Sequence, residues 1–462
     1  MKNVVKAISN FLSYQLRSVT GKVGNKRNTK IKQNAMVSLV IMVLSNLTAF
    51  ILMPVVIGYL DVTKYGLWLT INSILAWIFL LDLGLSGGLR TRLAEALARK
   101  DIEDANILIN TSYAFMGILM LVLSTAYYLI SPFIDWRRLF NAPPDYAGEL
   151  NQLMTVVVIF FFLRFALQIV NGMYTAVQRN SVSNLMNFAT QLLSLVAILG
   201  FAGQIQGSLF WIGFIYSLSP LIVFALGTIL FFRCFKQFKL SFRYIKLSAL
   251  KRVLDIGIFE FIDQIAFIIL MSATNFIIAH ISSPAQVVPY HVTMRIFGIF
   301  LTVFTVATNP LTPAFTEAFT LDDHSWIKAT FRKTNKLFFI CSLGVLMMIP
   351  FSKPIFSFLV KGKAELSYML VIIIAVTTLI RMYVSVFNKF LTGCGKVRLI
   401  AVTSLFSAFL YLFFVFVIGD YFDIGVNGVL ASQLAVGLIT APVMIIQTHK
   451  VLKHKAKGIW AR

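Results

Sequence analysis

Acidic residues are scarce in this chain of 462 residues, which has 18 Asp and Glu against 41 Lys and Arg. Charged residues of either sign make up only 13% of it, hydrophobic residues make up 58%, and the mean hydropathy is +0.82. An ordinary soluble domain has about 25% charged residues. The shortage of charge therefore excludes a soluble protein and indicates a membrane protein.

Cysteine and histidine are also few, at three and five residues. Their spacing matches neither a disulfide framework nor a metal site, so we expect no metal or other cofactor. Long connecting segments are missing as well, since the longest predicted external loop, Ser131 to Leu150, has only about 20 residues. This loop is too short for an external catalytic domain, and we expect the protein not to be an enzyme.

Apolar runs fill most of the chain, and twelve of them reach the length of about 20 residues that a helix needs to cross a bilayer. Runs this long exclude a membrane β-barrel, whose strands alternate in character over about 10 residues. The predicted fold is all-α, a polytopic bundle of twelve membrane-spanning helices. The predicted spans are 35–60, 65–86, 109–131, 151–176, 181–202, 208–232, 253–281, 287–317, 334–351, 367–391, 398–418 and 425–447.

The net charge is +23, and most of the Lys and Arg residues lie in the termini and in every second loop between the predicted spans. The intervening loops have only six Lys and Arg. This asymmetry follows the positive-inside rule, places both termini in the cytoplasm, and argues against a nucleic-acid partner. The predicted organisation is a basic segment 1–34, a six-helix lobe 35–232, a basic linker 233–252, a second six-helix lobe 253–447 and a basic tail 448–462.

The two predicted lobes repeat each other. An offset of 217 residues places Arg164 on Arg381, Gln168 on Ser385 and Asn171 on Asn388, at a spacing that puts each set on one helix face. An offset of 222 places "LRTRLAEAL" (89–97) on "LTPAFTEAF" (311–319). Both halves start on the same side, so the repeat is parallel, as in transporters whose lobes rock about a shared cavity.

Arginines at membrane depth indicate a cavity for an anion, because an arginine at the centre of a spanning helix costs about 2.5 to 3.5 kcal/mol. Guanidinium groups suit phosphate oxygens, so we expect a substrate with phosphate or carboxylate. An alternative is that the arginines pair with carboxylates, or that the polar faces only pack helices together. The predicted substrate-binding set is Arg164, Gln168, Asn171, Arg295, Arg381, Ser385 and Asn388.

Two further pairs of charged residues have two interpretations each. Glu260 and Asp263 share one face of the seventh span, where they would bind a coupling Na+ or H+ or would pair with the arginines. Arg90 and Arg92 follow the second span, where they would gather an anionic head group at the cytoplasmic mouth or serve as positive-inside anchors.

The segment "YGLWLTINSILAWIFLLDLGLSGGLRTRLAEALARKD" (65–101) resembles the second span and following helix of bacterial polysaccharide-biosynthesis flippases of the O-antigen (Wzx) type. "YGLW", "DLGL", "GLR" and "LAEALA" carry the resemblance. These flippases belong to the multidrug/oligosaccharidyl-lipid/polysaccharide exporter superfamily. The resemblance implies a V-shaped bundle in the bacterial inner membrane that flips an undecaprenyl-pyrophosphate-linked oligosaccharide, driven by an ion gradient, among membrane lipids and in association with polysaccharide polymerase machinery.

Three other functions compete with the flippase. A multidrug or organic-cation antiporter shares the architecture, but its cavity would favour acidic or aromatic side chains over arginines. A membrane enzyme such as a polymerase or ligase would need a large external loop. A scaffold would have little reason to duplicate charged faces at membrane depth. The flippase is therefore the predicted function, with the antiporter as the alternative.

Overall fold

The computed structural model describes residues 26–78, 85–177, 179–201, 207–255, 265, 269, 272–309, 311–396, 398–419, 425–453 and 455–461. All regular elements within these ranges are helices. Ten helices among the described residues are long and apolar enough to cross a membrane. The protein is therefore an all-helical, multi-pass membrane protein.

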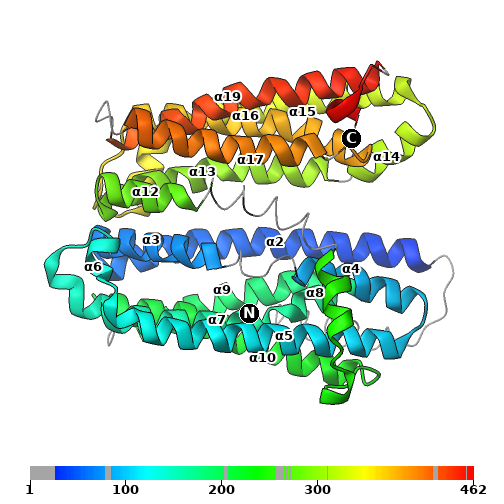
Figure 1. Cartoon of the computed structure of the whole chain (residues 1–462). Helices are drawn as coiled ribbons and strands as arrows, with labels where there is room; N and C mark the ends of the chain where they lie inside the picture. The colour runs from blue at the N-terminus through cyan, green and yellow to red at the C-terminus, as the bar shows by residue number, and fades with distance from the viewer. Residues whose placement is uncertain are drawn as a thin grey trace, which may run out of the picture.

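The helices form two lobes that lie one above the other in Figure 1. The first lobe holds α2 (Lys26–Tyr59), α3 (Val62–Ile78), α4 (Leu85–Ala98), α5 (Ile102–Ile130), α6 (Trp136–Leu139), α7 (Ala147–Leu167), α8 (Ile169–Ala176), α9 (Asn180–Gly200) and α10 (Leu209–Cys234). The second holds α12 (Ala273–Ile281), α13 (Pro284–Thr308), α14 (Leu311–Thr320), α15 (His324–Leu359), α16 (Tyr368–Gly393), α17 (Arg398–Phe413) and α19 (Gly425–Leu452).

The predicted spans agree with these helices in their centres and differ at their ends. The end predicted for the span 287–317 was wrong, because α13 ends at Thr308 and α14 is a separate helix. The sequence has Pro310 at this point, and a proline lacks the N–H that would continue the helix. The predicted spans 65–86 and 253–281 fall partly on residues outside the described ranges, as do Glu260 and Asp263.

Hydroxyl side chains inside the spanning helices bond mainly to their own backbone. Thr70 and Ser73 donate to the carbonyls of Gly66 and Leu69 over 2.9 Å each, and Thr377 donates to Ile373 over 2.8 Å. Such bonds to the carbonyl four residues earlier satisfy a hydroxyl where lipid offers no partner. This explains how apolar spans accommodate many Ser and Thr residues.

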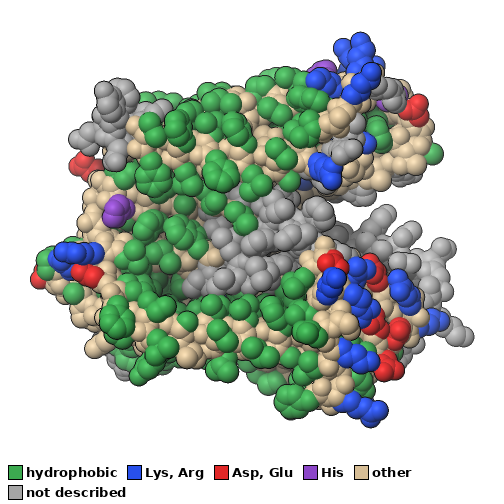
Figure 2. Space-filling view, viewed as in Figure 1, with side chains coloured by type: hydrophobic (Ala, Val, Ile, Leu, Met, Phe, Trp, Pro, Cys, Tyr) green, Lys and Arg blue, Asp and Glu red, His purple; other side chains and the backbone are tan. Residues whose placement is uncertain are grey.

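Lys and Arg gather at one end of both lobes, at the right of Figure 2. We call this the basic end, and many of its described basic residues come from α4, the linker 235–252, the start of α15 and the chain after α19. The lobes join toward the other end, where α3 packs against α12 and α13, and Asn275 donates to Ser73 Oγ over 2.9 Å. The lobes are thus held together at the end opposite the basic residues.

Two side chains strengthen this junction by crossing between the lobes. Lys363, between α15 and α16, donates to the Ile57 and Leu60 carbonyls at the end of α2, over 2.8 and 3.1 Å. Asn141, after α6, donates to the Ala279 carbonyl at the end of α12 over 3.2 Å. The last carbonyls of a helix have no partner within it, so a donor from the other lobe satisfies them. We call these two contacts the clasp.

Candidate substrate cavity

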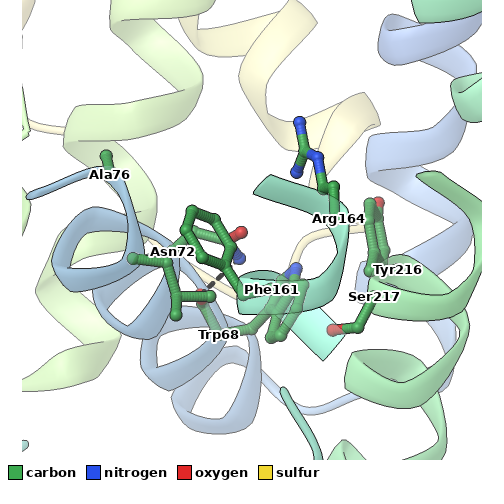
Figure 3. A pocket seen from close by; sticks show the side chains of 8 residues that line it. Trp68, Asn72, Ala76, Phe161, Arg164, Tyr216 and Ser217 are labelled. Carbon is green, nitrogen blue, oxygen red and sulfur yellow. Dashed lines mark hydrogen bonds between the residues drawn. The ribbon is translucent and has the colours of Figure 1, made fainter. Parts of the chain in front are cut away.

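A pocket of about 80 Å³ lies in the first lobe between α3, α7 and α10 (Figure 3). Trp68 and Asn72 come from α3, Arg164 from α7, and Tyr216 and Ser217 from α10 (Figure 3). The remaining lining residues are Leu75, Ala76 and Phe161. The pocket therefore combines one guanidinium group with aromatic rings and small polar groups.

Aromatic rings hold Arg164 in place. Its Cζ atom lies 5.8 Å from the ring centroid of Phe161 and 5.8 Å from that of Phe224. Trp68 and Tyr216 pack together at a centroid distance of 5.1 Å. Ring faces attract a cation and also exclude water, so these aromatic side chains position the guanidinium at the pocket.

Arg295 approaches the same region from the other lobe. It comes from α13, and its Cζ atom lies 5.6 Å from the ring centroid of Phe50 on α2. Its charge also acts on the hydroxyls of Tyr65 and Tyr216. Tyr216 lines the pocket with Arg164, so the charge of Arg295 from the other lobe acts on a residue of this pocket.

Arg381 lies in a separate tyrosine cluster of the second lobe. It comes from α16, and its charge acts on Tyr290 of α13 and Tyr411 of α17. The Tyr411 hydroxyl is 2.8 Å from Thr274 Oγ1. Tyr290 follows Trp68 by 222 residues, which is the offset of the second predicted repeat match.

The four predicted amide and hydroxyl partners do not line the pocket. Asn171 accepts a 2.6 Å hydrogen bond from Ser183 and so ties α8 to α9, while Ser385 donates to the Met382 carbonyl of its own helix over 2.7 Å. Gln168 Oε1 and Asn388 Oδ1 are buried and form no hydrogen bond with the described residues. The contact of Asn171 with Ser183 therefore supports the interpretation that Asn171 packs helices together. The side-chain oxygens of Gln168 and Asn388 could still accept hydrogen bonds from a ligand.

The face expected from Arg164 to Asn171 is not one straight helical surface. Helix α7 ends at Leu167, α8 begins at Ile169, and the Asn171 N–H donates to the Gln168 carbonyl over 2.9 Å. This tighter turn replaces one regular α-helical step. Regular helical spacing therefore holds before Gln168 and again after it, but the predicted face does not continue unbroken from Arg164 to Asn171.

Arg92 at the predicted mouth is engaged by protein groups. Its Nη1 atom lies 3.0 Å from Glu95 Oε2, and its Nε atom donates to the Arg252 carbonyl over 3.1 Å. It therefore holds the linker against α4. Arg90 is exposed on the same helix, and its predicted role in gathering head groups stays a prediction.

Aromatic and polar residues within apolar spans were the signal that sequence reasoning missed. Trp68 and Asn72 lie in "YGLWLTINS", and Tyr216 and Ser217 lie in "FIYSLSP". Each pair interrupts a run of aliphatic residues, and side chains of this kind at membrane depth usually face the bundle interior. A search for polar and aromatic pairs in every span would have found the pocket.

Cys394 follows the end of α16 at the second lobe's basic end. Burial raises the pKa of the Cys394 thiol to about 12, so this thiol stays protonated and is a poor nucleophile. Within the described part of the chain, no group of three His, Cys, Asp or Glu residues has a geometry for a metal ion. The predicted coupling residues Glu260 and Asp263 lie outside these ranges.

Comparison with known proteins gives one family for both lobes. The MatE family model matches residues 35–199 and 261–417. A Salmonella typhi protein provisionally named an O-antigen transporter is 20% identical over 347 residues, which cover 73% of this chain and 77% of that protein.

Solved structures give the same fold. An inward-facing multidrug resistance MATE transporter of the MOP superfamily has a TM-score of 0.75 at 15% identity, covering 91% of this chain and 98% of its own. An outward-facing one has a TM-score of 0.64 at 16% identity, with 92% and 96% covered. A MOP superfamily transporter from Pyrococcus furiosus, whose binding pocket is described as reversed in polarity, has a TM-score of 0.63 at 16% identity, with 93% and 96% covered.

The family model spans well over half of the chain and includes helices of both lobes. The fold agrees with it over nearly the whole length. The chain therefore belongs to the MatE family and is a multi-pass transporter of the MOP superfamily, not an enzyme.

Proposed function

We propose that this transporter flips an undecaprenyl-pyrophosphate-linked oligosaccharide, an O-antigen unit or a related surface polysaccharide unit, across the bacterial inner membrane by alternating access. In this proposal the chain has twelve spans in two pseudo-symmetric lobes, and both termini and the basic end face the cytoplasm. The positive-inside rule supports this sidedness. The oligosaccharide is the substrate, and the polymerase that extends it is the expected partner.

The observation that carries the proposal is the position of Arg164 in a pocket lined by aromatic and polar side chains, with Arg295 of the other lobe lying over the ring of Phe50. Two guanidinium groups from opposite lobes favour an anionic substrate between them, and a pyrophosphate offers the oxygens that such groups bind in pairs. Around them, Trp68, Asn72 and Ser217 provide the aromatic and polar surface that sugars require. Arg381 would contact the substrate from the second lobe, with Gln168 and Asn388 as partners for hydroxyl groups.

The contacts between the lobes support entry from the cytoplasm. The clasp and the α3 contacts join the lobes at the end opposite the basic end. The higher TM-score against the inward-facing relative agrees with that arrangement. In this state a lipid-linked sugar made in the cytoplasmic leaflet would enter between the lobes, and Arg90 would meet its charged head group first.

The proposal also includes coupling to Na+ or H+ through Glu260 and Asp263. Their spacing of three residues would place the two carboxylates on one face of the predicted seventh span, where either ion could bind. The name of the Salmonella typhi relative supports the substrate class. The multidrug antiporter remains the second candidate, because the multidrug resistance transporters share the fold and the pocket is rich in aromatic rings.

Deletion of the gene followed by analysis of lipid-linked sugars tests the proposal. We expect undecaprenyl-linked oligosaccharide to accumulate on the cytoplasmic face and surface polysaccharide to disappear, with both restored by the wild-type gene. Unchanged lipid-linked sugars together with increased drug sensitivity would instead support the antiporter. Normal surface polysaccharide and normal drug resistance would contradict both.

A further inference from the structure

The linker between the lobes is fastened to α5 along its backbone. Asn106 and Asn110 each donate one hydrogen bond to a linker carbonyl and accept one from a linker N–H, and Thr111 accepts one more. These three side chains are buried. The bonds join Asn106 to Gln237 (3.1 Å) and Lys239 (2.7 Å), Asn110 to Lys239 (2.8 Å) and Ser241 (2.9 Å), and Thr111 to Lys246 (3.0 Å).

The fastened linker exposes apolar and basic side chains together. Leu240, Phe242 and Leu247 are 59%, 91% and 81% exposed. The basic residues Lys236, Lys239, Arg243 and Lys246 are exposed between and beside them, and the sequence from 233 to 254 has no acidic residue. Because the backbone is held on α5, these apolar side chains stay on the surface.

The position of the linker along α5 matches the edge of the hydrocarbon layer. Thr111, which binds Lys246, precedes the end of α5 at Ile130 by 19 residues. A helix rises about 1.5 Å per residue, so this stretch is about 28 Å long, close to the hydrocarbon thickness of about 30 Å. If the far end of α5 is at one boundary of the hydrocarbon, the linker is at the other.

An ion pair fixes the end of the linker nearest the second lobe. Arg252 Nη2 lies 2.6 Å from Asp104 Oδ1, and the Arg252 carbonyl accepts from Arg92. Asp104 is thus engaged by Arg252 and does not neutralise the four basic residues between 236 and 246. Among the described residues, no ion pair joins any of these four side chains to a carboxylate.

From this arrangement we infer that residues 236–247 form a docking surface for the anionic phospholipids of the leaflet at the basic end. The apolar side chains enter the edge of the hydrocarbon, and the lysines and the arginine reach up to the phosphates. The charge selects anionic over zwitterionic lipid, because each Lys or Arg near an anionic surface favours binding about fivefold. Calling this leaflet cytoplasmic rests on the proposed sidedness, and the lipid site does not depend on the transported substrate.

Lipid retention by the full-length protein tests this inference. The purified protein is exchanged into equal amounts of phosphatidylglycerol and phosphatidylethanolamine, and native mass spectrometry measures the ratio of the two lipids retained. We expect the triple variant K239Q/R243Q/K246Q to lower the preference for phosphatidylglycerol by up to about 100-fold, which is fivefold for each of three charges. The matched control K328Q/K333Q/K336Q removes three exposed charges at the start of α15, at the same end of the other lobe, and should change the ratio less than about threefold.

Equal losses in the two triple variants, or no loss in the linker variant, would overturn the inference, since general surface charge would then account for retention. A second measurement does not depend on the charge variants. The fluorescence added by F242W should be quenched by phosphatidylglycerol brominated near the top of its acyl chains, and only weakly by lipid brominated near the chain ends. Absence of shallow quenching would also overturn the inference. Either failure leaves the sugar-flipping proposal untouched.

Discussion

At the scale of single residues, the arginines are the most unusual feature of the spanning helices. Arg164 lies between two phenylalanine rings, and Arg295 reaches the same cluster from the other lobe. Ring faces attract a guanidinium and leave it charged.

Neutralising the repeated arginines tests their proposed role. We expect R164Q and R381Q each to reduce surface polysaccharide at least tenfold, because a charge-assisted hydrogen bond contributes about 1.5 to 3 kcal/mol. Polysaccharide is measured in the deletion strain carrying each variant, with membrane protein levels determined in parallel. R332Q, which removes an exposed charge on α15, serves as the control and should keep normal export. Normal export by both variants would exclude a role for the arginines in transport.

Gly66 offers a different test at one atom. A Cβ at this position of α3 would collide with the carbonyl oxygen of Pro284 at the start of α13, whereas a Cβ at Gly117 of α5 would meet no atom within 4 Å. Overpacking costs about 1 to 3 kcal/mol, so G66A should lower the thermal unfolding temperature and push the lobes apart there. G117A should leave that temperature unchanged or raise it slightly, because alanine favours a helix. Equal unfolding temperatures for the two variants would show that α3 and α13 adjust freely.

At the scale of elements, each contact of the clasp joins the C-terminal carbonyls of a helix in one lobe to a hydrogen-bond donor in the other lobe. Lys363 of the second lobe reaches the end of α2, and Asn141 of the first lobe reaches the end of α12. A cation at a helix C-terminus is favoured by the helix dipole as well as by hydrogen bonds. Both contacts must break before the lobes part at this end.

Removal of Lys363 should therefore favour the opposite state of the transporter. We expect K363A to lengthen the distance between spin labels at Arg138 and Glu365, which are exposed on different lobes near the clasp. A loss of about 1 to 2 kcal/mol would change the ratio of the two states about 5-fold to 30-fold. The control K353A removes a lysine that lies 3.9 Å from the Tyr368 ring within the second lobe. An unchanged distance in K363A, or an equal change in K353A, would assign the clasp no part in closure.

At the scale of the whole molecule, the two lobes should move as bodies. Spin labels at Arg99 and Leu321, both exposed at the basic end on different lobes, should come closer in K363A as the labels near the clasp separate. Opposite changes at the two ends are the signature of rocking. Double electron–electron resonance spectroscopy measures both distances in protein whose native cysteines have been replaced. Separation at the clasp without approach at the basic end would indicate local opening only.

Much of this architecture could be predicted from hydropathy because lipid leaves a spanning segment few choices. The backbone groups of Val40–Tyr59 or Tyr368–Gly393 must bond within their own helix, so a long apolar run is sufficient to predict one. The ends were less certain, as α13 and α14 show, because outside the hydrocarbon water competes for the same backbone groups. Ser385 illustrates the limit for sites, since its hydroxyl could bond either a ligand or its own helix, and it bonds the Met382 carbonyl.

By itself the sequence determined that the protein crosses the membrane as helices and that most of its basic residues lie at one end, and it predicted that the halves repeat, since composition and periodicity record these properties locally. Only the tertiary structure decided which residues meet. Arg164 and Tyr216 lie on different helices and line one pocket, Arg295 of the other lobe lies over Phe50, and the charge of Arg381 acts on Tyr290 and Tyr411. The reason is that helix periodicity fixes the direction of a side chain around its own axis, whereas rotation and packing against neighbouring helices decide what that side chain faces.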